Sequence, residues 1–265
     1  METRLPTLFV PHGAPTFALR PGAAGAALAD IAASLPRPRA IVIVSPHWET
    51  DVPTVGHAER LGTIHDFYGF PPELYQIRYP ATGCPEGARE VAAAIAAAGL
   101  PVRDVASDGL DHGAWVPLRL MYPDADVPVI PVSLQSHAGP EHAYRLGQSL
   151  APLVDKGFLV IGSGNITHNL RDYMIARQNG GQTPGYVRDF PEWMSARLQD
   201  ADLDALLSYR EQAPGAVNAH PSDEHLLPLY VALGAAGKGA TVNRFHAGIS
   251  DYVLAMDAYT FTPTH

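Results

Sequence analysis

The sequence predicts an α/β fold with three layers, in which helices cover both faces of a central mixed sheet. Four apolar, β-branched runs are nearly continuous rather than alternating, which is typical of strands buried on both faces. Segments with helical composition lie between these runs, and a strand, helix, strand order favours a three-layer architecture. No internal repeat, low-complexity tract or linker divides the chain, so we expect one domain over residues 1–265.

The expected elements follow in chain order. Strands are predicted where the apolar runs occur, at residues 7–12, 40–47, 128–134 and 158–164. Helices are predicted at 24–35, 85–99 and 140–157, and the last two open with Pro and an early Glu and close at Gly. A helical block covers 187–209, and a last helix covers 222–237 with Ser222 or Asp223 as its N-cap. Residues 240–248 and 251–261 are expected to form closing antiparallel strands.

The segment 65–85 is rich in proline and lacks clear periodicity. A long irregular segment in a compact domain is usually functional, so we expect a lid or a pocket wall here. Its aromatic residues Phe67, Tyr68 and Phe70, together with Trp48, are candidates for stacking on an aromatic ligand.

Composition excludes several classes of protein. The 265 residues hold 18 Lys and Arg against 27 Asp and Glu, a formal charge of −9, which is unsuited to binding nucleic acid or an anionic membrane. Cys84 is the one cysteine, so a disulfide framework and a cysteine-rich zinc site are both excluded. No apolar run approaches the ~18 residues of a membrane span. We expect a cytoplasmic protein, as a monomer or small homo-oligomer.

Histidines stand where the buried strands end. His12 and His47 close the first two apolar runs, His168 follows the run at 158–164, and His112 lies in a turn before a helix. Ligands of open α/β sheets bind beyond the carboxyl ends of the strands, so these side chains are expected around one pocket. Neutral imidazole is the commonest metal ligand in proteins. The pattern therefore predicts a metal site built from histidines.

The third ligand stays open between Glu224 and His225. If both lie in the first helical turn, they point about 100° apart, so one of them faces the metal. Glu224 would complete a two-histidine, one-carboxylate triad of the non-haem iron type, and His225 would give a three-histidine face. His220 precedes a proline and is expected at the pocket rim or exposed to solvent.

The other polar candidates are given smaller roles. Asn165 and Asn169 flank His168 and are candidates for orienting its imidazole. His65 lies in the expected lid and is a minor candidate for substrate contact. No site role is expected for the remaining histidines, which are His57, His137, His142, His246 and His265.

Six motifs carry a resemblance to a known family. In chain order they are "PHGAP", "SPHW", "IHDFYGFPPELYQIRYPA", "GLDHGAWVPLRLMYPDADVPVIPVSL", "GSGNITHNL" and "DEHLLPLYVALGAA". Together they run from about residue 5 to about residue 255. The chain resembles the DOPA 4,5-dioxygenase branch of the class III extradiol ring-cleavage dioxygenases, which is related to the catalytic subunit of protocatechuate 4,5-dioxygenase. Ala14 and Pro46 depart from the commoner "HGSP" and "SAHW".

The resemblance implies roles for the histidines. His12, His47 and His225 match metal-ligand positions, whereas the protocatechuate branch uses a glutamate as its third ligand, which keeps Glu224 open. His168 matches the catalytic base and is a possible fourth ligand. His112 matches a second active-site histidine.

The implied reaction is the opening of a catechol by O2. One non-haem metal ion, Fe(II) for activity, would be required, and both atoms of O2 would enter a DOPA-like or caffeate-like substrate to give a semialdehyde. Zn(II) is a possible bound species and would leave the catechol uncleaved. The alternatives are a zinc-dependent hydrolase and a non-catalytic protein that binds a metal or a phenolic ligand on the same fold.

Overall fold

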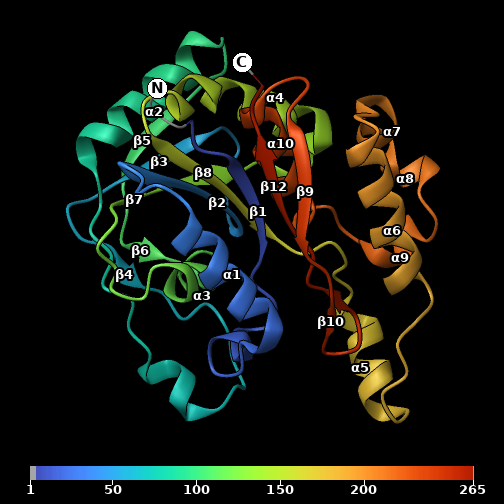
Figure 1. Cartoon of the computed structure of the whole chain (residues 1–265). Coiled ribbons are helices and arrows are strands. Elements are labelled where there is room, and N and C mark those ends of the chain that lie inside the picture. The colour runs from blue at the N-terminus through green and yellow to red at the C-terminus, as the bar shows by residue number, and fades with distance from the viewer. Residues whose placement is uncertain (1–3, 265) are drawn as a thin grey trace.

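An eight-stranded mixed sheet forms the centre of the molecule, described here for residues 4–264 by a computed structural model (Figure 1). The strand order is β5-β3-β7-β2-β8-β1-β12-β9. In chain order the strands are β1 (Thr7–Pro11), β2 (Ala40–Glu49), β3 (Thr54–His57), β5 (Arg103–Ala106), β7 (Val129–Leu134), β8 (Phe158–Gly164), β9 (Thr241–His246) and β12 (Ala258–Thr262).

The four strands β7, β2, β8 and β1 are parallel neighbours and form the buried middle of the sheet. Because they are parallel, their carboxyl ends meet at one edge. The strand β12 runs antiparallel to β1, and β9 runs antiparallel to β12 at the edge of the sheet, as predicted for the end of the chain. The first and last strands of the described chain are thus hydrogen-bonded to each other.

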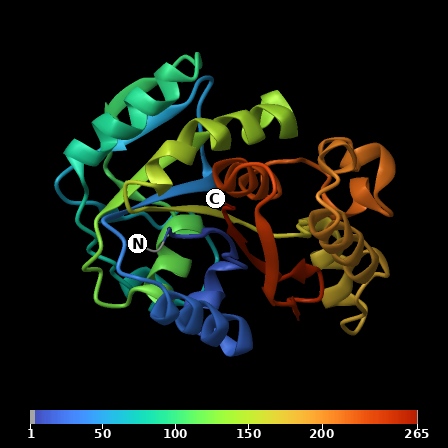
Figure 2. The ribbon, with the colours of Figure 1, turned by 45° about the horizontal axis from the view of Figure 1, so that its top comes forward.

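Helices cover both faces of the sheet, which confirms the predicted three-layer α/β class (Figure 2). One face packs against α1 (Gly22–Ser34) and α3 (His112–Met121). The other packs against α2 (Pro85–Ala97), α4 (Gly139–Val154) and α10 (Leu227–Ala236). Successive strand residues alternate between these two cores, as with Leu8 and Phe9 on β1. In residues 4–264 no helix is long and apolar enough to cross a bilayer.

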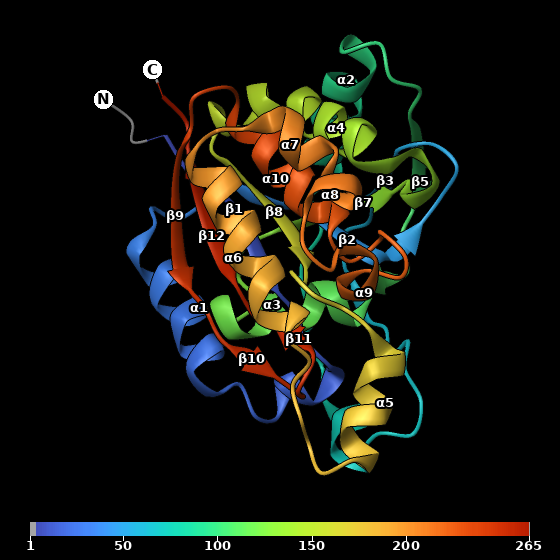
Figure 3. The ribbon, with the colours of Figure 1, turned by 90° about the vertical axis from the view of Figure 1, so that its right-hand side faces the viewer.

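The remaining helices lie to one side of the sheet, and all but the first of them are next to β9 and α10 (Figure 3). They are α5 (Leu170–Gln178), α6 (Tyr186–Gln199), α7 (Leu203–Leu207), α8 (Tyr209–Gln212) and α9 (Ala216–Ala219). Two short sheets, β4 (Gly62–Thr63) with β6 (Gly109–Leu110) and β10 (Ile249–Ser250) with β11 (Leu254–Ala255), lie outside the main sheet. Three 3-10 helices complete the part of the chain that is described: η1 (Pro15–Ala18), η2 (Pro72–Gln76) and η3 (Ser136–Ala138).

Two predicted boundaries are wrong. The helix expected from residue 222 begins at Leu227, with Pro228 in its first turn. The carbonyl of Asp223 accepts from the amides of Leu226 and Leu227, so Glu224 and His225 lie in a turn before the helix. The closing strand expected over 251–261 is split, because residues 251–253 form the turn between β10 and β11.

Glycines bring α10 close to its neighbours. A Cβ on Gly162 of β8 would lie 2.0 Å from the carbonyl oxygen of Pro228, and one on Gly164 would lie 2.2 Å from that of His225. A Cβ on Gly147 of α4 would lie 2.2 Å from the carbonyl oxygen of Val231. The amide of Asn165 donates to the His225 carbonyl at 2.9 Å, which fixes the turn before α10 against the end of β8.

We predict that Gly147→Ala destabilises the protein by about 1–3 kcal/mol, because the new methyl group overpacks the contact between α4 and α10. Helix propensity alone would predict the opposite sign, a gain of roughly 0.5–1 kcal/mol. Denaturant unfolding measures the difference. Gly185→Ala is the control, since the nearest atom to its new Cβ is 3.8 Å away, and its effect should stay within about 0.5 kcal/mol. A stabilised Gly147→Ala variant would contradict the close approach.

Candidate metal centre and active site

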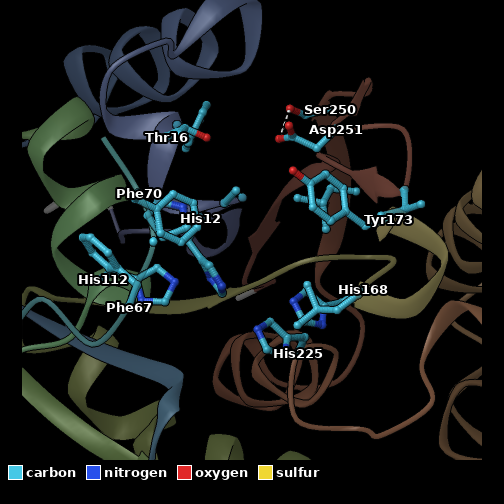
Figure 4. A pocket seen from close by; sticks show the side chains of 18 of the residues that line it. His12, Thr16, Phe67, Phe70, His112, His168, Tyr173, His225, Ser250 and Asp251 are labelled. Atoms are coloured by element: carbon cyan, nitrogen blue, oxygen red, sulfur yellow. Dashed lines mark hydrogen bonds between the residues drawn. The ribbon is translucent and has the colours of Figure 1, made fainter. Parts of the chain in front are cut away.

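A cavity of about 1030 Å³ opens at the carboxyl edge of the parallel strands. His12 follows β1, His47 lies near the end of β2, and His168 follows β8 after a short loop. His112 is the first residue of α3, and His225 lies in the turn before α10. Figure 4 shows side chains from these separate elements around the same space. The structure therefore brings together all five histidines that the sequence singled out.

Three of these rings form a nearly equilateral arrangement. The ring centroids of His12, His47 and His225 are 5.1–5.3 Å apart. The Nε2 atoms of His12 and His47 lie 3.3 Å apart. That separation is less than twice a Zn–N bond of ~2.1 Å, so one ion can contact both nitrogens.

The hydrogen bonds of His12 leave its Nε2 free to bind a metal. The Ser163 hydroxyl donates to the carbonyl of Gly113, so its oxygen accepts from the Nδ1–H of His12, 3.1 Å away. This assigns the proton of the neutral imidazole to Nδ1 and a lone pair to Nε2. Ser163 is buried on β8, so the tautomer of His12 is set by a neighbouring strand.

Glu224 accepts a hydrogen bond from His225, as Ser163 does from His12. Its Oε1 lies 3.1 Å from the Nδ1 of His225 and also accepts from the Ser222 hydroxyl at 3.0 Å. A carboxylate that accepts from Nδ1–H leaves the Nε2 of His225 unprotonated. The two adjacent residues thus form one hydrogen-bonded unit.

Asp66 links the irregular segment to two site histidines. Its carboxylate accepts from the backbone amide and from the Nδ1–H of His112, both at 2.9 Å, and lies 3.6 Å from Nδ1 of His47. Burial opposes ionisation of Asp66, but the hydrogen bonds and charge of His112 hold the pKa of Asp66 below its usual value. The ionised carboxylate can only accept, which places the Nδ1 proton on His112.

Asp111 and Ser45 fix the approach of α3 to His47. The Asp111 side chain caps α3 by accepting from the amide of Ala114 and also accepts from Ser45 Oγ at 2.6 Å. Ser45 Oγ in turn accepts from the amide of His47 at 3.3 Å. A Cβ on Gly113 would lie 2.9 Å from Cδ2 of His47, so only glycine allows this approach.

His168 stacks on His225. The two ring centroids are 3.5 Å apart and the planes differ by 4°. Ring lone pairs lie in the ring planes, so parallel rings cannot direct both lone pairs at one ion. In this arrangement, His168 would need to tilt before it could join His225 as a metal ligand.

Burial keeps the imidazoles of His12, His47, His168 and His225 neutral. It lowers the pKa of His12 and His225 well below the usual value, and the neighbouring histidines lower it further. Burial lowers the pKa of His47 to about 3 and that of His168 to about 4, although Asp66 and Glu224, respectively, act in the opposite direction. Neutral imidazoles have the lone pairs that metal binding requires.

Candidate ligand atoms fall into two groups within residues 4–264. Those of His12, His47 and His112 lie within 4.8 Å of one another, as do those of His168, Glu224 and His225. The groups adjoin, since the His225 ring lies 5.1 Å from that of His47. The donor set thus fits a single ion bound between them.

Several predicted positions are wrong. Asn165 accepts from the amide of Gly13, and Asn169 caps α5 and donates to the Asn218 carbonyl, so neither amide orients His168. His220 is fully buried and bonds the Ile166 carbonyl at 2.8 Å rather than standing exposed. Trp48 and His65 do not line the cavity, whereas Phe67, Tyr68 and Phe70 do, along with Pro71.

The remaining histidines among residues 4–264 do not line the cavity. His57, His137, His142 and His246 lie elsewhere, and His265 is outside the described residues. Ser163, Asp66 and Asp111 were missed by sequence reasoning. Ser163 lies in a predicted strand, and its pairing with Val10 of β1 places it near His12. The contacts of Asp66 and Asp111 depend on tertiary structure, for which the sequence offered no signal.

The chain matches the family model described as the catalytic LigB subunit of aromatic ring-opening dioxygenase over residues 24–257. A protein of Beta vulgaris named 4,5-DOPA dioxygenase extradiol is 42% identical over 231 residues, which are 86% of this chain and 84% of that protein. A protein of the same name from Escherichia coli is 37% identical over 239 residues, 88% of this chain and 86% of the relative.

A solved structure shows the same architecture. The crystal structure of an uncharacterized protein from Escherichia coli superposes with a TM-score of 0.80 at 30% sequence identity. The match covers 97% of this chain and 99% of that one. These comparisons confirm the resemblance given by the six motifs.

We predict that the metal-free protein loses stability as the pH falls from 7.5 to 5.5. The pKa is lowered to about 3 for His47 and His220 and to about 4 for His168, mainly by burial. The unfolded chain takes up protons near pH 6.5 while the folded chain does not, so protonation favours unfolding below that pH. The expected loss is roughly 1 kcal/mol per buried histidine at pH 5.5.

Urea unfolding in EDTA at several pH values measures this slope. His220→Gln keeps a donor for the Ile166 carbonyl and removes one titrating group, so its slope should be shallower than that of the unmodified protein. Stability that stays constant over this pH range would contradict the burial of neutral histidines.

Proposed function

Because the chain belongs to the LigB family of aromatic ring-opening dioxygenases and is an extradiol dioxygenase, we propose that it uses one Fe(II) ion held by His12, His47 and His225. The observation that supports this most directly is the set of three neutral imidazoles whose ring centroids are 5.1–5.3 Å apart at the carboxyl edge of the sheet.

The alternative third ligand, Glu224, has a different part in this proposal. Its carboxylate is engaged by the Nδ1 of His225 and by Ser222. A carboxylate in this position orients a ligating histidine and raises its basicity. We therefore assign Glu224 to the support of His225, as Ser163 supports His12.

When bound, Fe(II) supplies adjacent open coordination positions and the electrons that couple a catechol to O2. Zn(II) fits the same imidazoles and has no redox chemistry, so a zinc-loaded protein should bind catechols without cleaving them. The ring opening itself gives a semialdehyde that contains both oxygen atoms.

His168 is the proposed base that takes a proton from the catechol hydroxyl. Its pKa, lowered to about 4 by burial, leaves the ring neutral and able to accept a proton. The charge of Glu224 acts in the opposite direction, so it would stabilise the imidazolium once the proton has arrived. The stacking on His225 holds the base beside the metal ligands.

His112 is the proposed second proton-transfer group. Asp66 binds its Nδ1–H, which orients the ring and stabilises a positive charge on it. His112 can therefore carry a proton at Nε2 and donate it when the O–O bond breaks. Phe67, whose ring centroid is 5.6 Å from that of His112, gives this end of the cavity an aromatic wall.

A DOPA-like or caffeate-like catechol is the proposed substrate. The cavity of about 1030 Å³ is larger than a catechol ring and leaves room for a side chain. The relatives named 4,5-DOPA dioxygenase extradiol favour this size of substrate. The aromatic residues of the irregular segment would lie along the ring, and the opposite end of the cavity would receive the side chain.

We predict that His225→Ala lowers the affinity for Zn(II) more than 100-fold, whereas Glu224→Ala lowers it only about 10–100-fold. Competition with a chromophoric chelator measures both values without any turnover. His57→Ala is the control, because His57 is outside the cavity and should leave the affinity unchanged. A larger loss in Glu224→Ala than in His225→Ala would make the glutamate the ligand.

We predict that His168→Ala, loaded with Fe(II), keeps its metal and loses at least about 100-fold in catechol turnover. Iron content and O2 uptake are measured on the same sample, with His142→Ala as a control that lies outside the cavity. Loss of the iron together with the activity would show that His168 has a structural or ligating role. Unchanged turnover would rule it out as the base.

A further inference from the structure

Three charged side chains outside the histidine cluster and its partner Glu224 also line the cavity. They are Arg20 after η1, Arg177 on α5, and Asp251 in the turn between β10 and β11. Figure 4 shows Ser250, Asp251 and the Tyr173 hydroxyl at one end and His168 and His225 at the other. Among residues 4–264, none of these three charged groups is in an ion pair within 4.0 Å.

The Asp251 carboxylate has one oxygen engaged and one available. The Ser250 hydroxyl donates to Oδ2 of Asp251 at 2.9 Å. Asp251 is partly buried at the cavity wall, where an unpaired carboxylate is worse solvated than on an open surface. A cationic group on a ligand would compensate that charge.

The backbone that carries Asp251 is strained. Asp251 has φ of 49° and Tyr252 has φ of 67°, both in the left-handed region. Aspartate tolerates this region, and a hairpin turn can require it, but tyrosine rarely adopts it. Strain of this kind persists where the surrounding structure holds the residue in place, and it is concentrated at ligand sites.

Two contacts hold the turn. Thr167 Oγ1 donates to the Val253 carbonyl at 2.7 Å and accepts from the Ala255 amide at 2.8 Å, so the hairpin is bonded to the residue before His168. The Tyr252 ring packs so closely on Gly181 that a Cβ there would lie 2.6 Å from Cε1. Asp251 is therefore held in a defined position relative to the proposed base.

We propose that Asp251, oriented by Ser250, is a specificity-determining residue that binds a cationic nitrogen on the side chain of the catechol. This inference rests on the proposed function, because it takes the histidine end of the cavity as the catechol site. The two hydroxyls lie at the metal and the side chain extends toward the hairpin. Arg177 and Arg20 line the same cavity and carry the opposite charge, so they favour a catechol whose side chain has an anionic group.

The test measures binding to the Zn(II)-loaded protein, which needs no turnover. The probes are dopamine, with a cationic side chain, 3,4-dihydroxyphenylpropanoate, with an anionic one, and 4-methylcatechol, with neither. Asp251→Asn keeps the shape and the tolerance for the left-handed region, so it removes only the charge. Asp189→Asn is the control, because it removes the same charge from an exposed position of α6 outside the cavity.

Asp251→Asn should weaken dopamine binding about tenfold relative to 4-methylcatechol, and it should leave or strengthen the binding of the propanoate. Arg177→Gln should weaken the propanoate relative to 4-methylcatechol and leave dopamine unchanged or strengthened. Asp189→Asn should change none of these ratios. An equal effect of Asp251→Asn on dopamine and 4-methylcatechol, or the same dopamine ratio in Asp189→Asn, would overturn the assignment.

Turnover of 4-methylcatechol by the Fe(II)-loaded protein is followed in parallel, since this probe carries no side-chain charge. If 4-methylcatechol is not turned over but the binding ratios change as expected, the proposed reaction is refuted and Asp251 remains a recognition residue. If 4-methylcatechol is turned over but the binding ratios do not change, the role of Asp251 is refuted and the proposed reaction stands.

Discussion

The burial of four neutral imidazoles around one cavity, those of His12, His47, His168 and His225, is the constraint on which the rest of the site depends. Each buried ring needs a partner for its N–H, and Ser163, Glu224 and Asp66 accept from Nδ1 of His12, His225 and His112. Ser163 and Glu224 thus leave the Nε2 lone pairs of His12 and His225 inside the cavity, where only a cation or a proton donor can satisfy them. The hydrogen bonds around the histidines thus determine what the cavity can bind.

The fold supplies these rings from five separate segments. Parallel strands place His12 and His47 at one edge of the sheet, and Gly162 and Gly164 let the turn that carries His225 approach β8. Gly113 likewise lets α3 approach His47 closely. The irregular segment adds Asp66, and the β10–β11 hairpin closes the other end with Asp251. The proposed metal end and the proposed side-chain end therefore come from different parts of the chain, so the two can vary independently.

Sequence reasoning was most successful where it depended on strand direction. His12, His47 and His168 were expected around one pocket because each ends or follows a continuous apolar run, and ligands of open α/β sheets bind beyond the carboxyl ends of the strands. It failed where local patterns competed with tertiary contacts. The stretch around His225 has the composition of a helix start, but it forms a turn in which the amides of Leu226 and Leu227 donate to the Asp223 carbonyl. His220 was expected to be exposed and is buried, and the acceptors Ser163 and Asp66 are 151 and 46 residues away from their histidines.

The most direct test is O2 uptake by protein reconstituted anaerobically with Fe(II), with a zinc-loaded sample as the control and DOPA and caffeate among the catechols. We expect stoichiometric consumption of O2 and a yellow product in the iron sample alone. No uptake with any catechol, despite confirmed iron occupancy, would contradict the assignment of Fe(II) to these histidines as a ring-opening centre and would favour a zinc hydrolase or a binding protein.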